Sequence, residues 1–437
     1  MSRVIYPTTN LAATEQLTIA RGEGVYVYDS AGKQYLEGMS GLWCTGLGYN
    51  NREVIDAISE QLGNLSYTHM FGGKTHPGAI QLAEKLAGMV PVEDAMVFFG
   101  NSGSDANDTH IKLLRYYFNA IGKPGKRKII TRERAYHGVT VAAGSLTSLP
   151  ANLAHFDAPL AALGIVRTDA PHYYRGAQAG ESSAQFVSRL ADNLEALIAR
   201  EGADTIAAFI AEPIAGAGGV IVPPAGYYEA IQPLLREHDI LFWADEVITG
   251  FGRTGKLFGC DSMNITQPDM MTFAKQLSSA YFPISASVIR GDMYQAMVEP
   301  SAKVGIFGHG FTYSGHPAGC AAALATLHIY ERDNLYAHAS LMGDYLQDKL
   351  AALADLERVG EVRGRGLIAA VELVEDKSSH KADNALARKA TLRCQENGLI
   401  VRNVAGCALA LCPPLIISKA QIDEMVDILH RSIVEVS

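Results

Sequence analysis

Five short apolar runs in the middle of the chain restrict its fold more than any other feature of the sequence. They cover residues 95–99, 128–131, 206–211, 240–244 and 270–274, and helical patterns separate them. Strands that are apolar on both faces are typical of a parallel sheet that helices cover on both sides. The sequence therefore predicts an α/β fold built on a large, mostly parallel sheet.

The segments outside these runs predict a second, smaller α+β domain. Residues 23–37 alternate apolar and polar side chains around an Asp-Ser-Ala-Gly turn, which indicates a β-hairpin. Long helices follow over roughly 319–354, then strands near 366–374 and 408–412, and a final helix begins at Lys419. We expect the hairpin to join this second domain. The predicted division is a large domain of residues 51–318 and a split small domain of residues 1–50 and 319–437.

Composition and charge disfavour several classes of partner. The chain of 437 residues has a net charge of −9 and no run of lysine and arginine, so neither nucleic acid nor an anionic membrane is expected. None of the six cysteines forms a Cys-x-x-Cys pair, which disfavours zinc and fits a reducing compartment. The chain start lacks a signal-peptide pattern, and no apolar run is long enough to span a membrane. We expect a cytoplasmic protein without a bound metal.

Polar residues follow all five apolar runs. In open parallel α/β sheets, ligands bind beyond the carboxyl ends of the strands, so these residues are expected to converge on one site. The site would contain a candidate phosphate loop, an aromatic residue, acids and a lysine. In chain order, the segments are Gly-Asn-Ser-Gly-Ser-Asp-Ala-Asn-Asp from Gly100, Ala-Tyr-His-Gly from Ala135, Glu212-Pro213, Asp245-Glu246, and Lys275.

Each of these segments has a functional and a structural interpretation. The first runs into a predicted helix over residues 105–117, and a helix N-terminus favours an anion, although a turn with a helix cap fits too. Lys275 is either a surface lysine or a desolvated amine able to form a Schiff base. Asp245 needs a cation if it is buried, and a pyridinium nitrogen would serve. Tyr136 either packs in the core or lies flat on a planar ring, and Glu212 either binds a ligand or merely ends a strand.

A glycine-rich segment at residues 250–255 imitates a dinucleotide-binding motif. Its pattern is Gly-x-Gly-x-x-Gly after a predicted strand, and Asp269 lies at a distance suited to a ribose contact. Residues 256–269 are rich in Gly, Asp, Asn and Pro, so they do not supply the long helix that such a fold requires. Residues 364–369 are a weaker match of the same kind. The sequence therefore disfavours an NAD-dependent oxidoreductase.

Several blocks together resemble class III aminotransferases, which depend on pyridoxal 5′-phosphate (PLP). The blocks are Phe-Trp-Ala-Asp-Glu-Val from Phe242, Gly-Phe-Gly-Arg-Thr-Gly, then Asp269 and Lys275. Asn-Ser-Gly-Ser-Asp-Ala-Asn-Asp, Ala-Tyr-His-Gly, Ala-Glu-Pro-Ile-Ala-Gly-Ala-Gly-Gly and His-Gly-Phe-Thr-Tyr-Ser-Gly-His-Pro match in order. The resemblance covers nearly the whole chain and implies PLP fold type I, the aspartate-aminotransferase-like fold. Asp105 stands where the family usually has glutamate.

The resemblance implies a role for each site residue. Lys275 would hold PLP as a Schiff base and later move the proton at the substrate carbon, and Asp245 would keep the pyridine nitrogen protonated. Tyr136 and Val247 would cover the two faces of the ring. A homodimer with shared active sites is expected, in which Thr312 reaches the phosphate in the partner subunit. Ser102, Gly103 and Ser104 would hold the phosphate, and His137, Gly138 and Glu212 complete the expected cofactor site.

Finer details resemble the branch that acts on ω-amino acids or transfers from amines to pyruvate. They are Ser-Gly-Leu-Trp-Cys with Trp43, and Gly-Leu-Ile-Val-Arg-Asn-Val-Ala-Gly with Arg402. Arg402 would grip a substrate carboxylate with its planar fork, or would simply be a surface charge. Phe71, next to Met70, resembles a residue that lines the pocket from the other subunit. Glu133 stands where some amine transaminases have an aromatic residue, and would disfavour large apolar amines if it faces the pocket.

The function that follows is amino transfer from an ω-amino acid or primary amine to an oxo-acid, with pyruvate as the expected acceptor. The mechanism would be a ping-pong exchange through a Schiff base. An aminomutase or a decarboxylase on the same fold is the alternative, and a PLP-binding protein without turnover is a remote one. The sequence leaves open the donor, the stereoselectivity, the choice between dimer and tetramer, and the direction in which Glu133 points.

Overall fold

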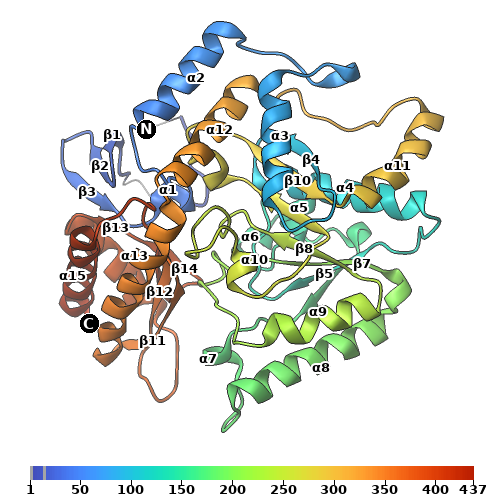
Figure 1. Cartoon of the computed structure of the whole chain (residues 1–437). Helices are drawn as coiled ribbons and strands as arrows, with labels where there is room; N and C mark the ends of the chain where they lie inside the picture. The colour runs from blue at the N-terminus through green and yellow to red at the C-terminus, as the bar shows by residue number, and fades with distance from the viewer. Residues whose placement is uncertain (1–2, 13–15) are drawn as a thin grey trace.

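The computed structural model describes residues 3–12 and 16–437, and its largest sheet has seven strands (Figure 1). The order is β4-β10-β9-β8-β7-β5-β6, and every strand is parallel to its neighbours except β10, which is antiparallel to β4 and β9. This confirms the predicted mostly parallel sheet. The strands are β4 Met96–Gly100, β5 Lys128–Arg132, β6 Ile165–Thr168, β7 Ile206–Ala211, β8 Leu241–Asp245, β9 Met270–Phe273 and β10 Ser285–Ile289.

Helices cover both faces of this sheet, because its central strands are apolar on both sides. All residues of β7, β8 and β9 are buried. On one face, Leu114 and Phe118 of α4 pack with Trp243 of β8, and on the other, Leu190 of α8 and Ile231 of α9 belong to the core around the sheet. The helices that flank the sheet are α3 Pro77–Met89, α4 Gly103–Ala120, α8 Ser183–Glu201, α9 Tyr227–Glu237 and α11 Gly291–Val304, with the short α5 Val141–Leu146, α6 Pro150–Leu153, α7 Tyr173–Gly176 and α10 Gly259–Ser262.

Two smaller sheets lie outside the large one, and the first of them joins the N-terminal and C-terminal parts of the chain. The predicted hairpin is present as β2 and β3, and β3 pairs in parallel with β13 near the C-terminus. The hairpin therefore joins the C-terminal segment, as expected, whereas the exact domain boundaries stay a prediction. The first sheet contains β1 Ile19–Glu23, β2 Tyr26–Asp29, β3 Gln34–Glu37 and β13 Leu399–Ile400, and the second contains β11 Val359–Arg365, β12 Ile368–Leu373, β15 Ala408–Leu411 and β14 Arg402–Val404.

The helices α13 Leu335–Ala351, α14 Asn384–Glu396 and α15 Lys419–Val436 pack against these smaller sheets. Figure 1 shows α13 and α15 on the same side of the molecule as β11, β12 and β13. The long helical pattern after residue 319 divides at Asn334, whose φ of 49° breaks the helix. Within the described ranges, no helix is long and apolar enough to cross a membrane. The remaining helices are α1 Ser40–Trp43, α2 Arg52–Asn64 and α12 Pro317–Arg332, and α2 packs against α12.

Candidate active site

A cavity of about 360 Å³ lies at the carboxyl ends of the central strands, and we call it the Asp245 cavity. Parallel strands bring their carboxyl ends to one edge of a sheet, so side chains from distant parts of the chain meet there. Of the eleven residues predicted to bind a cofactor, all but Thr312 line this cavity. They are Ser102, Gly103, Ser104, Tyr136, His137, Gly138, Glu212, Asp245, Val247 and Lys275.

The first turn of α4 forms one end of the Asp245 cavity, where an anion was predicted to bind. Ser102 caps the helix by accepting the N–H of Asp105, and Asp105 accepts the N–H of Ser102 (3.0 Å) in return. The shorter acid at position 105 thus completes a capping box. The next N–H groups, of Gly103 and Ser104, have no partner within the helix. A Cβ on Gly103 would lie 2.9 Å from Val247 Cγ2, so only glycine leaves the space open.

Asp245 is the last residue of β8, and its side chain is buried. Its Oδ2 atom lies 3.1 Å from Asn107 Nδ2 and 2.7 Å from His137 Nδ1, and its Oδ1 atom accepts the N–H of Val247 at 3.1 Å. Thr272 donates to Asn107 Oδ1 at 2.8 Å and so orients the amide. These donors hold the carboxylate in one position, which suits it to bind a cationic nitrogen.

Lys275 follows β9 in a strained backbone conformation, with a φ of 45°. Such strain gathers at functional sites. Burial lowers the pKa of its ammonium group, and Cys44 and Asp245 partly oppose this effect. Among the described residues, no hydrogen bond or ion pair holds the ammonium in place. A desolvated lysine of lowered pKa loses its proton more readily and becomes a nucleophile.

Glu212 supports the wall of the cavity through the backbone. Its Oε1 atom accepts the N–H of Tyr136 (3.1 Å), and its Oε2 atom accepts the N–H of Gly216 (2.9 Å). Burial raises the pKa of this carboxyl group. The side chain therefore fixes the position of Tyr136, and its two oxygens are already engaged.

A second cavity, of about 690 Å³, adjoins the first, and we call it the Arg402 cavity. Tyr136 and Lys275 line both cavities, whereas Trp43, Glu133 and Arg402 line only the second. Burial lowers the pKa of the Arg402 guanidinium group, and no described side chain pairs with it. The result is a partly buried cation close to Lys275 and open to an anionic ligand. Glu133, whose direction the sequence left open, lines this cavity.

Two predicted site residues lie away from both cavities. Thr312 is exposed, and its carbonyl oxygen accepts a hydrogen bond from the Tyr67 hydroxyl (2.8 Å). Phe71 is 46% exposed and borders a different hollow together with Gly310. Both residues were predicted to act on the site of a partner subunit, and those roles stay predictions.

The structure adds a residue that the sequence analysis missed, Arg253 in the glycine-rich segment 250–255. Its side chain is fully buried. Its Nη1 atom donates to the carbonyl oxygens of Leu367 (3.0 Å) and Pro413 (2.5 Å), and its Nη2 atom donates to Ser40 Oγ (3.2 Å). Arg253 thus joins three segments of the chain, one of which continues into Trp43. The helix after this segment, α10, has only four residues, which confirms that no dinucleotide-binding helix follows.

Asp269 likewise has a structural contact in place of the ribose contact considered from the sequence. It accepts the N–H of Phe242 at 2.6 Å and forms an ion pair with Arg290.

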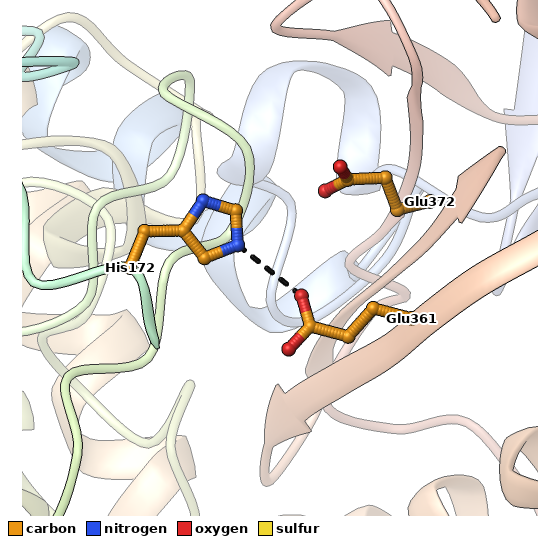
Figure 2. A group of neighbouring side chains, drawn as sticks. All are labelled: His172, Glu361 and Glu372. Carbon is orange, nitrogen blue, oxygen red and sulfur yellow. Dashed lines mark hydrogen bonds and ion pairs between the residues drawn. The ribbon is translucent and has the colours of Figure 1, made fainter. Parts of the chain in front are cut away.

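A cluster of His172, Glu361 and Glu372 resembles a metal site in composition (Figure 2). His172 Nε2 lies 3.2 Å from Glu361 Oε2. Arg363 pairs with both glutamates, at 2.6 Å and 2.5 Å, and Arg175 also pairs with Glu372. Two guanidinium groups already neutralise the two carboxylates, so a divalent cation would have to displace them. We assign no metal to this cluster.

Comparisons with known proteins agree with this geometry. The family model of class III aminotransferases matches residues 9–433. A probable γ-aminobutyrate transaminase 2, mitochondrial, of Oryza sativa subsp. indica is 46% identical over 418 residues, which are 95% of this chain and 83% of the relative. A γ-aminobutyrate transaminase 3, chloroplastic, of Solanum lycopersicum is 45% identical over 416 residues, which are 94% of this chain and 79% of that protein.

Solved structures are similar over almost the full length. The ω-transaminase of Pseudomonas jessenii in complex with PMP is 48% identical, with a TM-score of 0.96 over 99% of this chain and 96% of that one. A transaminase with L-alanine is 50% identical, with a TM-score of 0.94 over 96% of this chain and 99% of that one. The family match, these identities and the site at the strand ends show that the chain belongs to the PLP-dependent class III aminotransferases of fold type I.

Proposed function

We propose that this aminotransferase takes an amino group from an ω-amino acid or a primary amine and passes it to pyruvate. The observation that carries the acceptor is Arg402, a partly buried cation without a partner in the described chain, in the cavity that contains Lys275. Arginine binds a carboxylate with two parallel hydrogen bonds. The similar proteins support the donor class, because they include γ-aminobutyrate transaminases and ω-transaminases.

The residues of the Asp245 cavity fit PLP. Class III aminotransferases use this cofactor, whose ring withdraws electrons and stabilises negative charge on the substrate carbon. The start of α4, with Gly103 leaving room beside Val247, suits a phosphate group. Asp245 suits the protonated ring nitrogen, and Tyr136 and Val247 suit the two faces of the ring.

The roles of the chain's own groups follow from their positions. Lys275 Nζ would hold the cofactor between turnovers and would be released as a free amine when the donor binds. The released amine, whose pKa is lowered by burial, then takes and returns the proton at the substrate carbon. Asn107 and Val247 donate hydrogen bonds to Asp245 and hold its carboxylate in the position that suits the ring nitrogen. Trp43 lines the Arg402 cavity and gives it an apolar wall.

A homodimer with shared active sites is part of the proposal. Thr312 and Phe71 lie outside the cavities of their own chain, as expected for residues that act on a partner's site. Exposed aromatic and aliphatic side chains surround them, including Tyr67, Ile306 and Tyr313. Apolar surface of this kind marks an interface. We also infer a cytoplasmic location, which the six free cysteines support.

The proposal is tested by visible absorbance of the purified enzyme while a neutral aryl-alkyl amine and then pyruvate are added. The colour of the bound cofactor should bleach with the amine and return with pyruvate. An aminomutase or decarboxylase needs no oxo-acid, so its colour would not depend on pyruvate.

The acceptor role of Arg402 is tested by the variant Arg402→Ala. The KM for pyruvate should rise about tenfold or more, since a charged hydrogen-bonded pair is lost, while binding of PLP should change little. Unchanged pyruvate kinetics would show that Arg402 does not bind the acceptor.

A further inference from the structure

A chain of buried hydrogen bonds begins at Trp243, to which the reaction gives no role, and ends at Asp245. Trp243 Nε1 donates to Thr272 Oγ1 at 2.8 Å. Thr272 Oγ1 donates to Asn107 Oδ1 at 2.8 Å, and Asn107 Nδ2 donates to Asp245 Oδ2 at 3.1 Å. The side chains of Trp243, Thr272 and Asn107 are fully buried. Bulk water therefore does not compete for these hydrogen bonds, and each one strengthens the next.

These side chains meet on one face of the central sheet because of their positions in the strands and in α4. Trp243 and Asp245 are two residues apart on β8, and alternate residues of a strand point to the same face. Thr272 of β9 pairs in register with Asp245. Leu114 of α4 packs in the same core cluster as Trp243, and Asn107 lies seven residues before it, on the same side of the helix.

The donors and acceptors of this chain determine which end of the Asn107 amide faces Asp245. The indole N–H of Trp243 is only a donor, so Thr272 Oγ1 accepts from it and directs its own proton to Asn107 Oδ1. The NH2 group of Asn107 therefore faces Asp245 Oδ2 and also donates to the carbonyl oxygen of His137 at 2.6 Å. A flipped amide would place its oxygen against two acceptors. Trp243 and Thr272 thus stabilise one orientation of the amide.

The two oxygens of Asp245 are not equally occupied. Oδ2 contacts Asn107 Nδ2 and lies 2.7 Å from His137 Nδ1. Oδ1 accepts the N–H of Val247 at 3.1 Å, and no other described residue donates to it. Asp245 lines the cavity that fits PLP. Oδ1 thus has room for one more donor, which a protonated ring nitrogen would supply.

We propose that Trp243 and Thr272 are positioning residues, which act through Asn107 to hold Asp245 for the ring nitrogen of PLP. This inference rests on the cofactor site of the proposed function, and is independent of the choice of donor and acceptor. Without the Thr272 hydroxyl, Asn107 Oδ1 would be buried without a donor, and the amide would no longer be held against Asp245. The interaction of Asp245 with the ring nitrogen should then weaken.

The test is a calorimetric titration of the PLP-free protein with PLP and with its carbocyclic analogue, in which C–H replaces the ring nitrogen. Thr272→Val keeps the shape of the side chain and removes the hydroxyl. Its Kd for PLP should rise about fivefold, because one buried hydrogen bond is lost, and its Kd for the analogue should stay within about twofold of the wild-type value. Thr272→Ser keeps the hydroxyl and should keep both Kd values.

Two further variants sharpen this test. Trp243→Phe keeps an aromatic ring but lacks the N–H, so the Kd for PLP should rise by about twofold to threefold and the Kd for the analogue should not. It tests the first link even if Thr272→Val fails to fold. Thr326→Val is the matched control, because Thr326 is fully buried on α12 and its hydroxyl bonds to no described residue. Both of its Kd values should equal those of the wild-type protein.

The outcomes separate this inference from the proposed function. If the wild-type protein binds PLP no tighter than the analogue, Asp245 does not pair with the ring nitrogen, and the proposed cofactor site is wrong. If the wild-type protein prefers PLP and Thr272→Val weakens both ligands equally, or neither, the positioning role is wrong. Thr272→Ser loses a buried methyl group and should unfold more readily. If its Kd for PLP rose along with this loss of stability, the role of Thr272 would be structural only.

Discussion

Two glycine-rich segments follow strands of the central sheet, and only one of them lines a ligand cavity. Residues 100–105 lead from β4 into α4, a helix of 18 residues, and residues 101–104 line the Asp245 cavity. Residues 250–255 follow β8, and the next helix has four residues. The free N–H groups and the dipole of a long helix attract an anion, and a single turn offers little of either. The helix that follows a glycine motif therefore decides whether the motif can bind a phosphate.

The glycines of the second segment serve close packing. Gly252 has a φ of 102°, and a Cβ there would lie 3.0 Å from the Tyr336 ring. Gly255 has a φ of 80°, and a Cβ there would lie 2.9 Å from Ser340 Cα. Both contacts are with α13, so the segment lets this helix approach closely. Arg253, between the two glycines, donates buried hydrogen bonds to Ser40, Leu367 and Pro413, and we call these contacts the Arg253 clamp. One segment thus lines the Asp245 cavity, and the other joins parts of the fold.

The largest effect is expected from Arg253→Met. The change leaves the carbonyl oxygens of Leu367 and Pro413 and the hydroxyl of Ser40 without their donor in a buried place. The free energy of unfolding should fall by about 4 kcal/mol, which urea denaturation of the PLP-bound enzyme would measure. Arg236→Met, at an exposed position on α9, is the control and should change stability by less than about 0.5 kcal/mol. If Arg253→Met and Arg236→Met had equal free energies of unfolding, the hydrogen bonds of Arg253 would not stabilise the fold.

Much of the central sheet and of the site at its edge could be predicted, because apolar runs and the polar residues that follow them are local features of the sequence. The five apolar runs gave the strands β4, β5, β7, β8 and β9 within one or two residues of their observed ends. Strand ends that share one edge of a parallel sheet then placed Asp245 and Lys275 together. The strands β6 and β10 were missed. β10, Ser285–Ile289, contains two serines, and serine is a poor signal for a strand.

The role of the second segment was not predictable, because its partners are distant in the chain. Arg253 contacts Leu367 and Pro413, which lie 114 and 160 residues further on. Long-range contacts of this kind leave no periodic pattern in the sequence. The same holds for Asn107, which orients Asp245 from 138 residues away. A charged or amide residue inside a family motif was the only sign that either side chain had a specific partner.

A smaller effect is expected at Glu37, which borders the loop that Arg253 holds. Burial raises the pKa of this carboxyl group from 4.5 to about 7, against the hydrogen bond that it accepts from the Met39 N–H. Between these values the folded state keeps a proton that the unfolded state has lost. Stability should therefore fall as the pH rises from about 5 to 8, by roughly 3 kcal/mol from this group. Denaturation midpoints measured across this range would show the fall.

The variant Glu37→Gln should remove that part of the pH dependence, since its amide does not titrate. Glu60→Gln, at an exposed position on α2, should keep it. A pH profile of Glu37→Gln identical to that of the wild-type enzyme would mean that another group is responsible. In that case the region around Arg253 would not contain the pH-sensitive group.

The smallest effect is expected in the first segment, from Gly103→Ala, and it should appear in cofactor affinity and leave stability nearly unchanged. The new methyl group would lie 2.9 Å from Val247 Cγ2, so Val247 must move towards the space of the ring. Overpacking of this size costs about 1.4 kcal/mol, which raises the Kd for PLP about tenfold in an absorbance titration. Gly88→Ala, on α3 with open space around it, is the matched control and should leave the Kd unchanged. Suppose instead that Gly103→Ala lowered the free energy of unfolding of the PLP-free protein by more than it weakened the free energy of PLP binding. The two glycine-rich segments would then share a structural role, and the contrast between them would fail.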